Sequence, residues 1–225
     1  TMGGAIRRFD NFAMKSWLET RTGLPVSVEN DANCVLLAER WQGKAAEMAN
    51  FLVLTIGTGI GGAIFCQHQL INGARFRAGE FGYMLTDRPG GRDPRRYSMN
   101  ENCTLRVLRH RYAQHIGAPL DSVTGELIFD RYDAGDPVCQ RLVAEFFNGL
   151  GHGLYNLVHI CDPQTIFIGG GVVERPGFLT LLRQHLAWFG IADYLDTVSH
   201  GNDAGLIGAV YHFNQLYRSP DDDRH

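Results

Sequence analysis

Hydrophobic positions along the chain fall into short β-branched runs that alternate with longer segments of helical spacing. The short runs predict strands over residues 25–28, 51–56, 63–70, 165–168 and 194–199. The periodic segments predict helices over residues 10–22, 32–41, 101–115, 124–132, 136–160, 177–189 and 204–217. Because strands and helices alternate, the sequence predicts an α/β fold with a largely buried sheet.

The run Phe51–Ile56 leads directly into Gly57, Thr58, Gly59, Ile60, Gly61 and Gly62. Glycines permit positive φ and let a ligand approach bare N–H groups, so such a turn suits phosphate oxygens. The string matches G-x-G-x-x-G, but a dinucleotide site needs a helix next, and residues 63–70 predict a strand. A strand, a glycine turn and a second strand are typical of the phosphate hairpin of actin-like sugar kinases. The alternative is an ordinary tight hairpin.

Two further clusters follow predicted strands, namely Asn30-Asp31 and Gly169–Gly171. Ligands of open α/β sheets bind beyond the carboxyl ends of the strands, so all three clusters could face one cleft. Asn30 and Asp31 could instead only cap a helix. Gly169–Gly171 could be a plain turn from a strand to a helix.

Composition narrows the class of protein. The 225 residues carry a net charge of -3, which does not favour a nucleic-acid partner, and they suffice for one large domain or two small ones. The apolar runs are too short to cross a bilayer. The five cysteines are scattered, odd in number and without C-x-x-C, which indicates free thiols in a reducing cytoplasm.

Four motifs occur in order: VENDAN at 28–33, LTIGTGIGG at 54–62, AGEFG at 78–82 and IFIGGG at 166–171. With these motifs the chain resembles the ROK family (repressors, open reading frames, sugar kinases) over roughly residues 23–216. The resemblance implies the actin-like ATPase (ribonuclease H-like) fold. It also implies ATP-dependent phosphorylation of a sugar hydroxyl, commonly the 6-hydroxyl, with ATP and Mg²⁺ as cofactors.

The resemblance assigns roles by position. Asp31 matches the catalytic base, whose carboxylate takes the hydroxyl proton. The positions that match sugar-binding residues are Asn30, Glu80 and Tyr83. The positions that match ATP-binding residues are Gly57, Thr58, Gly59 and Gly61 at the phosphates, and Gly169 and Gly170 at the adenosine.

Two family features are altered. The pattern E-x-G-H appears as Glu80-Phe-Gly-Tyr83, and the cysteine cluster C-x-C-G-x-x-G-C is replaced by Tyr97–Thr104, in which only Cys103 remains. One thiolate cannot build a four-coordinate site, so no structural zinc is expected. Members that lack zinc include β-glucoside kinases, which suggests a glucose-type hexose or a β-glucoside as acceptor. Asn100 or Glu101 could stand in for a carboxylate that normally follows the cluster.

The resemblance also divides the chain. Residues 1–29 are expected to end a first lobe, 30–203 to form the second, 204–218 to form a helix that packs back on the first, and 219–225 to be a disordered tail. The family's opening D-x-G-G-T turn is absent, so the chain is expected to be N-terminally incomplete and inactive alone. A cytoplasmic homodimer is expected from the family.

Two alternatives to a kinase stay open. One is the sugar-sensing portion of a ROK-type transcriptional repressor without kinase activity, and the other is a pseudo-enzyme that only binds sugar. The retained Asp31 and the intact turn at Gly57–Gly59 favour the kinase.

Overall fold

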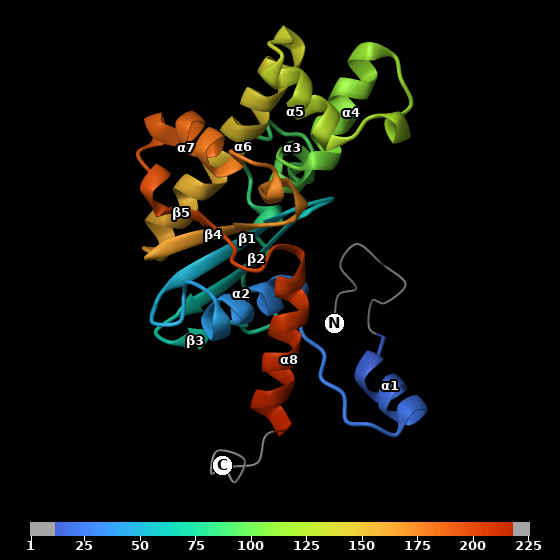
Figure 1. Ribbon diagram of the computed structural model, residues 1–225, viewed down its shortest axis with the longest axis vertical. Helices are drawn as coiled ribbons and strands as arrows, with labels where there is room; N and C mark the ends of the chain where they lie inside the picture. Colours follow the sequence, from blue (N-terminus) through green and yellow to red (C-terminus); the bar gives the residue numbers. More distant parts are fainter. Residues whose placement is uncertain (1–11, 218–225) are drawn as a thin grey trace.

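The computed structural model describes residues 12–217, which fold into a sheet covered by helices on both faces (Figure 1). The strands are β1 Phe51–Ile56, β2 Ile60–Cys66, β3 Gln69–Leu70, β4 Thr165–Gly169 and β5 Leu195–Thr197. The α-helices are α1 Met14–Thr22, α2 Asp31–Gln42, α3 Met99–Asn102, α4 Leu105–Ile116, α5 Gly125–Asp133, α6 Pro137–Cys161, α7 Phe178–Leu186 and α8 Ala204–Tyr217.

The five strands lie in the order β3-β2-β1-β4-β5. β1 and β2 form an antiparallel hairpin, whereas β4 runs parallel to β1 on the other side, with Thr55 beside Gly169. β5 extends the parallel half. The carboxyl ends of β1 and β4 therefore meet at one edge of the sheet, and the turns that follow them are neighbours.

The alternating side chains of β1 supply two separate cores. Leu52, Leu54 and Ile56 pack with α6 and the helices around it, and Phe51 and Val53 pack with α2. Figure 1 shows α6 and α7 on one face of the sheet and α2 and α8 on the other. The predicted buried sheet is confirmed, since β1 and β4 are covered on both faces.

Residues 25–28, predicted as a strand, are extended but pair with no strand among residues 12–217. Their polar backbone groups bond to neighbouring segments instead: Val26 N donates to Glu19 Oε1 at 3.3 Å, and the Tyr217 hydroxyl donates to Val26 O at 3.1 Å. The extended conformation was predicted correctly and the sheet partner was not.

The single helix predicted over residues 101–115 is two helices, α3 and α4, which are separated at Cys103 and Thr104. Cys103 and Met99 are fully buried and fill the space beside Gly149 and Gly153 of α6. Thr104 then caps α4, because its Oγ1 accepts from Val107 N at 3.2 Å. The break thus follows from packing against α6, which local periodicity does not reveal.

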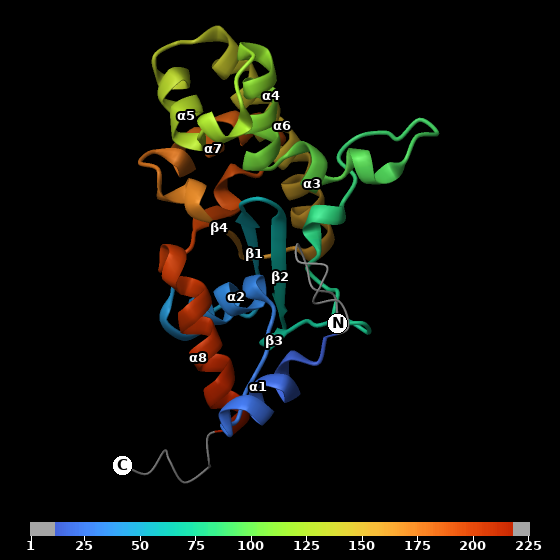
Figure 2. The ribbon, with the colours of Figure 1, turned by 90° about the vertical axis from the view of Figure 1, so that its right-hand side faces the viewer.

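α8 lies against α2 (Figure 2). The two backbones approach so closely that a Cβ at Gly208 would overlap the backbone of Cys34. The division into lobes stays a prediction, and the expected tail at 219–225 lies outside the described residues. No helix within residues 12–217 has the length and apolar character needed to cross a membrane.

Candidate active site

Local hydrogen bonds hold the beginning of α2. Asn30 is the N-cap, and its Oδ1 accepts from Ala32 N at 2.9 Å and from Asn33 N at 3.2 Å. Glu29 Oε1 accepts from Asn30 N at 2.6 Å and from Asn33 Nδ2 at 2.9 Å. The capping interpretation of Asn30 is therefore confirmed. The cap uses only the carbonyl oxygen, so the Nδ2 group of Asn30 remains a donor for a ligand.

Asp31 is the first residue of α2 and is exposed to solvent. Its Oδ1 accepts from Ala32 N at 2.9 Å, and the positive end of the helix dipole favours its negative charge. The side chain thus presents an accessible carboxylate on a fixed backbone, which is what a general base requires.

The turn between β1 and β2 consists of Gly57, Thr58 and Gly59. Gly57, Gly59 and Gly61 are not among the glycines with positive φ, so the turn does not use the left-handed conformation that glycine permits. Gly57 N donates to Gly59 O at 2.9 Å and is used within the turn. Among the described residues, the N–H groups of Thr58 and Gly59 have no protein partner, and both residues are exposed. These two amides are the donors that a phosphate could use.

Gly61 brings the beginning of α2 next to this hairpin. A Cβ at Gly61 would lie 2.6 Å from Thr55 Oγ1 and 3.5 Å from Ala32 Cβ. A larger residue would therefore overlap the Thr55 hydroxyl of β1 and leave no free space toward α2. Packing accounts for the glycine at this position, and a contact of Gly61 with ATP stays a prediction.

The segment with Glu80 and Tyr83 packs on the first half of β2. A Cβ at Gly62 would overlap the Phe81 ring, and Gly79 lies against the Gly62 carbonyl. Within residues 12–217 the Glu80 carboxylate has no hydrogen bond or ion pair. Tyr83 is 51% exposed, with the Arg77 guanidinium 5.8 Å from its ring centroid. Both side chains are thus available to a ligand.

The glycines after β4 lie against the end of β1. Gly170 has φ +97°, and a Cβ there would overlap the Ile56 carbonyl oxygen. Gly169 is buried and faces Val198 and Thr55. Residues 171–174 form a 3₁₀ turn before α7 begins at Phe178. Packing explains both glycines, so their contact with adenosine stays a prediction.

The sequence predicted Asn100 only as one of two residues, with Glu101, that could stand in for a carboxylate. Its Oδ1 accepts from Ile60 N, the first residue of β2, at 2.7 Å. The sequence carries no signal for this bond, because α3 is a single turn whose direction is set by α6.

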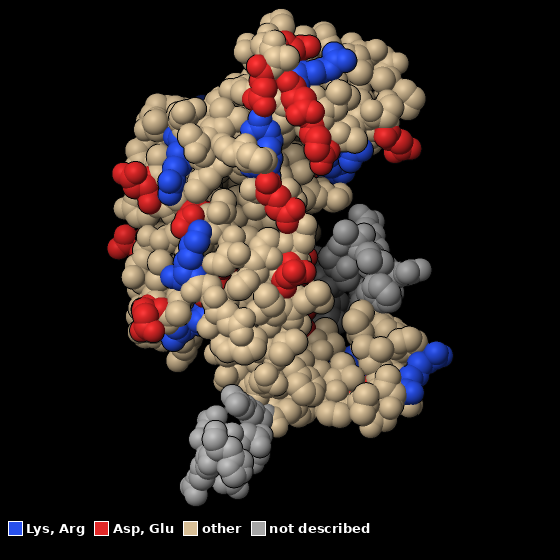
Figure 3. Space-filling model, in the orientation of Figure 1, with Lys and Arg blue, Asp and Glu red and all other residues tan. Residues whose placement is uncertain are grey.

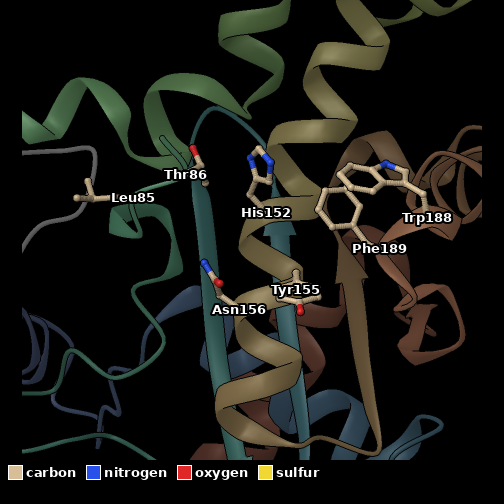
Figure 4. A pocket seen from close by; sticks show the side chains of 7 residues that line it. All are labelled: Leu85, Thr86, His152, Tyr155, Asn156, Trp188 and Phe189. Atoms are coloured by element: carbon tan, nitrogen blue, oxygen red, sulfur yellow. The ribbon is translucent and has the colours of Figure 1, made fainter. Parts of the chain in front are cut away.

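The predicted residues therefore gather at one edge of the sheet, where β1 and β4 end and α2 begins. An open cavity of about 600 Å³ lies elsewhere, beside α6 (Figure 4). It is lined by Leu85, Thr86, His152, Tyr155, Asn156, Trp188 and Phe189, and none of the predicted site residues contributes to it.

The sequence of residues 5–215 matches the model of the ROK family. The chain belongs to the ROK family. Among the family's members, a β-glucoside kinase from Listeria innocua serovar 6a is 59% identical over 216 residues, which make up 96% of this chain and 74% of that protein. The motif-based resemblance is thereby confirmed.

Solved structures of this family have the same fold. Lmo2764 from Listeria monocytogenes, solved as a candidate N-acetylmannosamine kinase, has a TM-score of 0.90 at 57% identity. The matched region makes up 96% of this chain and 75% of that chain. A ROK hexokinase from Thermus thermophilus has a TM-score of 0.79 at 30% identity, with coverages of 93% and 72%. The actin-like ATPase fold that the ROK resemblance implies is confirmed.

No group of three or more His, Cys, Asp or Glu side chains within residues 12–217 is placed to hold a metal ion. Burial raises the pKa of Cys103 to about 12, and its sulfur lies against Gly149 rather than toward other ligands. We predict that a chelator leaves the melting temperature unchanged, because a neutral buried thiol does not bind zinc. Elemental analysis that finds one tightly held zinc per chain would contradict this prediction.

All five cysteines are unpaired, and their burial differs. Burial, with a contribution from the Glu29 and Asp31 carboxylates, raises the pKa of Cys34 to about 11. Because the thiolate is the reactive form, Cys34 and Cys103 should resist brief iodoacetamide treatment at pH 8, whereas the half-buried Cys66 should react first. Peptide mass spectrometry measures the order, and equal rates for Cys34 and Cys66 would contradict it.

Proposed function

We propose that the protein phosphorylates a sugar hydroxyl with ATP, with a glucose-type hexose or a β-glucoside as acceptor and O6 as the position. The observation that carries the proposal is that the beginning of α2, with the exposed carboxylate of Asp31, lies beside the hairpin that carries the free amides of Thr58 and Gly59. A proton acceptor beside phosphate donors is the minimum arrangement for phosphoryl transfer to an alcohol.

In this proposal Asp31 accepts the proton of the sugar hydroxyl as that oxygen attacks the terminal phosphorus of ATP, and ADP leaves as the bond from that phosphorus to the bridging oxygen breaks. Asn30 Nδ2 donates to a sugar hydroxyl, and the Glu80 carboxylate accepts from another. Tyr83 offers a phenolic hydroxyl where the family pattern has histidine. Because Asn30 and Asp31 share the rigid beginning of α2, the acceptor is oriented by the same backbone that carries the base.

The free amides of Thr58 and Gly59 fit the phosphates of ATP, and Gly169 and Gly170 are assigned to its adenosine. Mg²⁺ would neutralise phosphate charge when bound, and no described residue is assigned to it. The described residues offer one phosphate hairpin. We therefore also propose that the 225-residue chain alone has no measurable turnover, since the phosphoryl group needs positioning from both sides.

The acceptor is the finest part of the proposal. The similar proteins are named for different sugars, one as a β-glucoside kinase and one as a candidate N-acetylmannosamine kinase. The proposal takes a β-glucoside because Tyr83 replaces the histidine of the family pattern.

The proposal also includes a cytoplasmic homodimer, which rests on the family and on the unpaired cysteines. On the face in Figure 3, Lys and Arg are interspersed with Asp and Glu.

The test is a coupled assay of ADP release with cellobiose, glucose and N-acetylmannosamine as acceptors, on this chain and on an N-terminally extended form. Turnover of the extended form with cellobiose or glucose, and a product phosphorylated at O6, would support the proposal. Sugar binding without ADP release by either form would support the sugar-sensing alternative. Turnover by the 225-residue chain would refute the proposal that the phosphoryl group needs positioning from both sides.

A further inference from the structure

Asn100 lies between the tip of the β1–β2 hairpin and the turn that carries Glu80 and Tyr83. Its Oδ1 accepts from Ile60 N at 2.7 Å, and a Cβ at Gly59 would lie 3.3 Å from the same oxygen. On the other side, a Cβ at Gly82 would lie 2.5 Å from Oδ1. One amide group therefore contacts both the proposed phosphate segment and the proposed sugar segment.

The backbone of Asn100 is held from behind. Met99 and Cys103, on either side of it, insert beside Gly153 and Gly149 of α6, and Met99 N donates to Met84 O at 2.9 Å. These contacts fix α3 against α6, so the Asn100 side chain reaches the hairpin from a rigid support. Because α3 is rigid, a hydrogen bond from Asn100 restrains the movement of the hairpin.

Ile60 directly follows the two free amides of Thr58 and Gly59, and its own side chain is buried. Without the Asn100 oxygen, the Ile60 N–H would lose the acceptor that the structure gives it. The tip of the hairpin would then be free to move relative to Gly82.

We propose that Asn100 is a positioning residue that couples the two halves of the site: it fixes the amides of Thr58 and Gly59 relative to Glu80 and Tyr83. This inference rests on the proposed function, in which those amides bind phosphate and those side chains bind sugar. It makes the affinity for nucleotide depend on a residue that need not touch the nucleotide.

The variants are Asn100→Leu, which has a similar size but no acceptor, and Asn100→Asp, which keeps an acceptor oxygen. Asn102→Ala is the matched control, because Asn102 lies on the same helical turn but donates to Arg96 O and Ser98 O, away from the hairpin. Amide hydrogen exchange at Ile60 is followed by NMR with ¹⁵N-labelled isoleucine. Binding of MgADP, with and without cellobiose, is followed by calorimetry on this chain and on the extended form.

We expect Asn100→Leu to raise the rate of amide exchange at Ile60 by about tenfold, which corresponds to the loss of one hydrogen bond. The affinity for MgADP should fall by about tenfold as well. The proposed coupling also predicts that cellobiose tightens MgADP binding in the wild type, and in Asn100→Leu this tightening should fall toward onefold. Asn100→Asp should retain the protection of Ile60, and Asn102→Ala should match the wild type in both measurements.

Unchanged MgADP affinity in a folded Asn100→Leu protein would overturn the inference while leaving the proposed function intact. Loss of Ile60 protection in Asn100→Asp as well would also overturn it, because the acceptor oxygen would then not be what matters. Failure of the wild type to bind MgADP in either form would refute the proposed function itself.

Discussion

Asp31→Asn should lower kcat by roughly 10²- to 10⁴-fold in the active form of the protein while sugar affinity stays close to that of the wild type. The amide cannot accept the hydroxyl proton, but it keeps the size of the carboxylate and can still accept from Ala32 N, as Oδ1 does now at 2.9 Å. The beginning of α2 should therefore be preserved. Steady-state kinetics with cellobiose, together with direct titration of the sugar, separates the two effects.

The matched control is Asp193→Asn, which changes an exposed aspartate in the first turn of a 3₁₀ helix away from α2. It removes the same charge without touching the site, so its kcat should match that of the wild type. Near-normal kcat in Asp31→Asn would remove Asp31 from the role of base. A loss of sugar affinity in Asp31→Asn as large as its loss of activity would instead indicate that Asp31 mainly binds the acceptor.

Gly208→Ala should destabilise the protein by about 3 kcal/mol, near the upper end of what overpacking usually costs. The added methyl group would overlap the Cys34 backbone of α2, and backbone cannot rotate away as a side chain can. α8 would have to move outward, and the buried Ala204 one turn earlier would lose its packing. Urea unfolding measures the change in the free energy of unfolding.

Gly205 supplies the control within the same helix. A Cβ at Gly205 meets no atom within 4 Å, so Gly205→Ala should gain helix propensity and stabilise by about 0.5 to 1 kcal/mol. The opposite signs of the two substitutions distinguish close helix contact from a general effect of glycine. Equal effects at the two positions would show that α8 does not pack on α2 as described.

The sequence predicted the architecture well because a run of apolar residues within one segment already indicates a buried strand. The run Phe51–Ile56 corresponds to β1 with no shift in position, whereas the strand predicted over residues 63–70 is two strands, β2 Ile60–Cys66 and β3 Gln69–Leu70. Residues 25–28 have the same local pattern but no partner among the described residues, and pairing is a property of two segments. The break at Cys103 likewise depends on Gly149 in a helix far along the chain.

The candidate site was predicted unevenly for a similar reason. Motifs identified Asn30, Asp31 and Glu80, and the structure brings their segments to the hairpin. The motif did not reveal that Gly57 uses its own amide within the turn, nor that Gly61 is packed against Thr55 without a positive φ. Asn100 escaped a clear assignment because its bond to Ile60 spans 40 positions in sequence.

The contact between Gly170 and the Ile56 carbonyl has a consequence for how the two glycine motifs can vary. Because one turn rests on the backbone of the other, a substitution in either is tolerated only if the second can shift with it. Stability effects of changes in the two turns should therefore be non-additive, as for any residues in direct contact. In a mutational library the two segments would behave as one epistatic unit, although more than a hundred positions separate them in the chain.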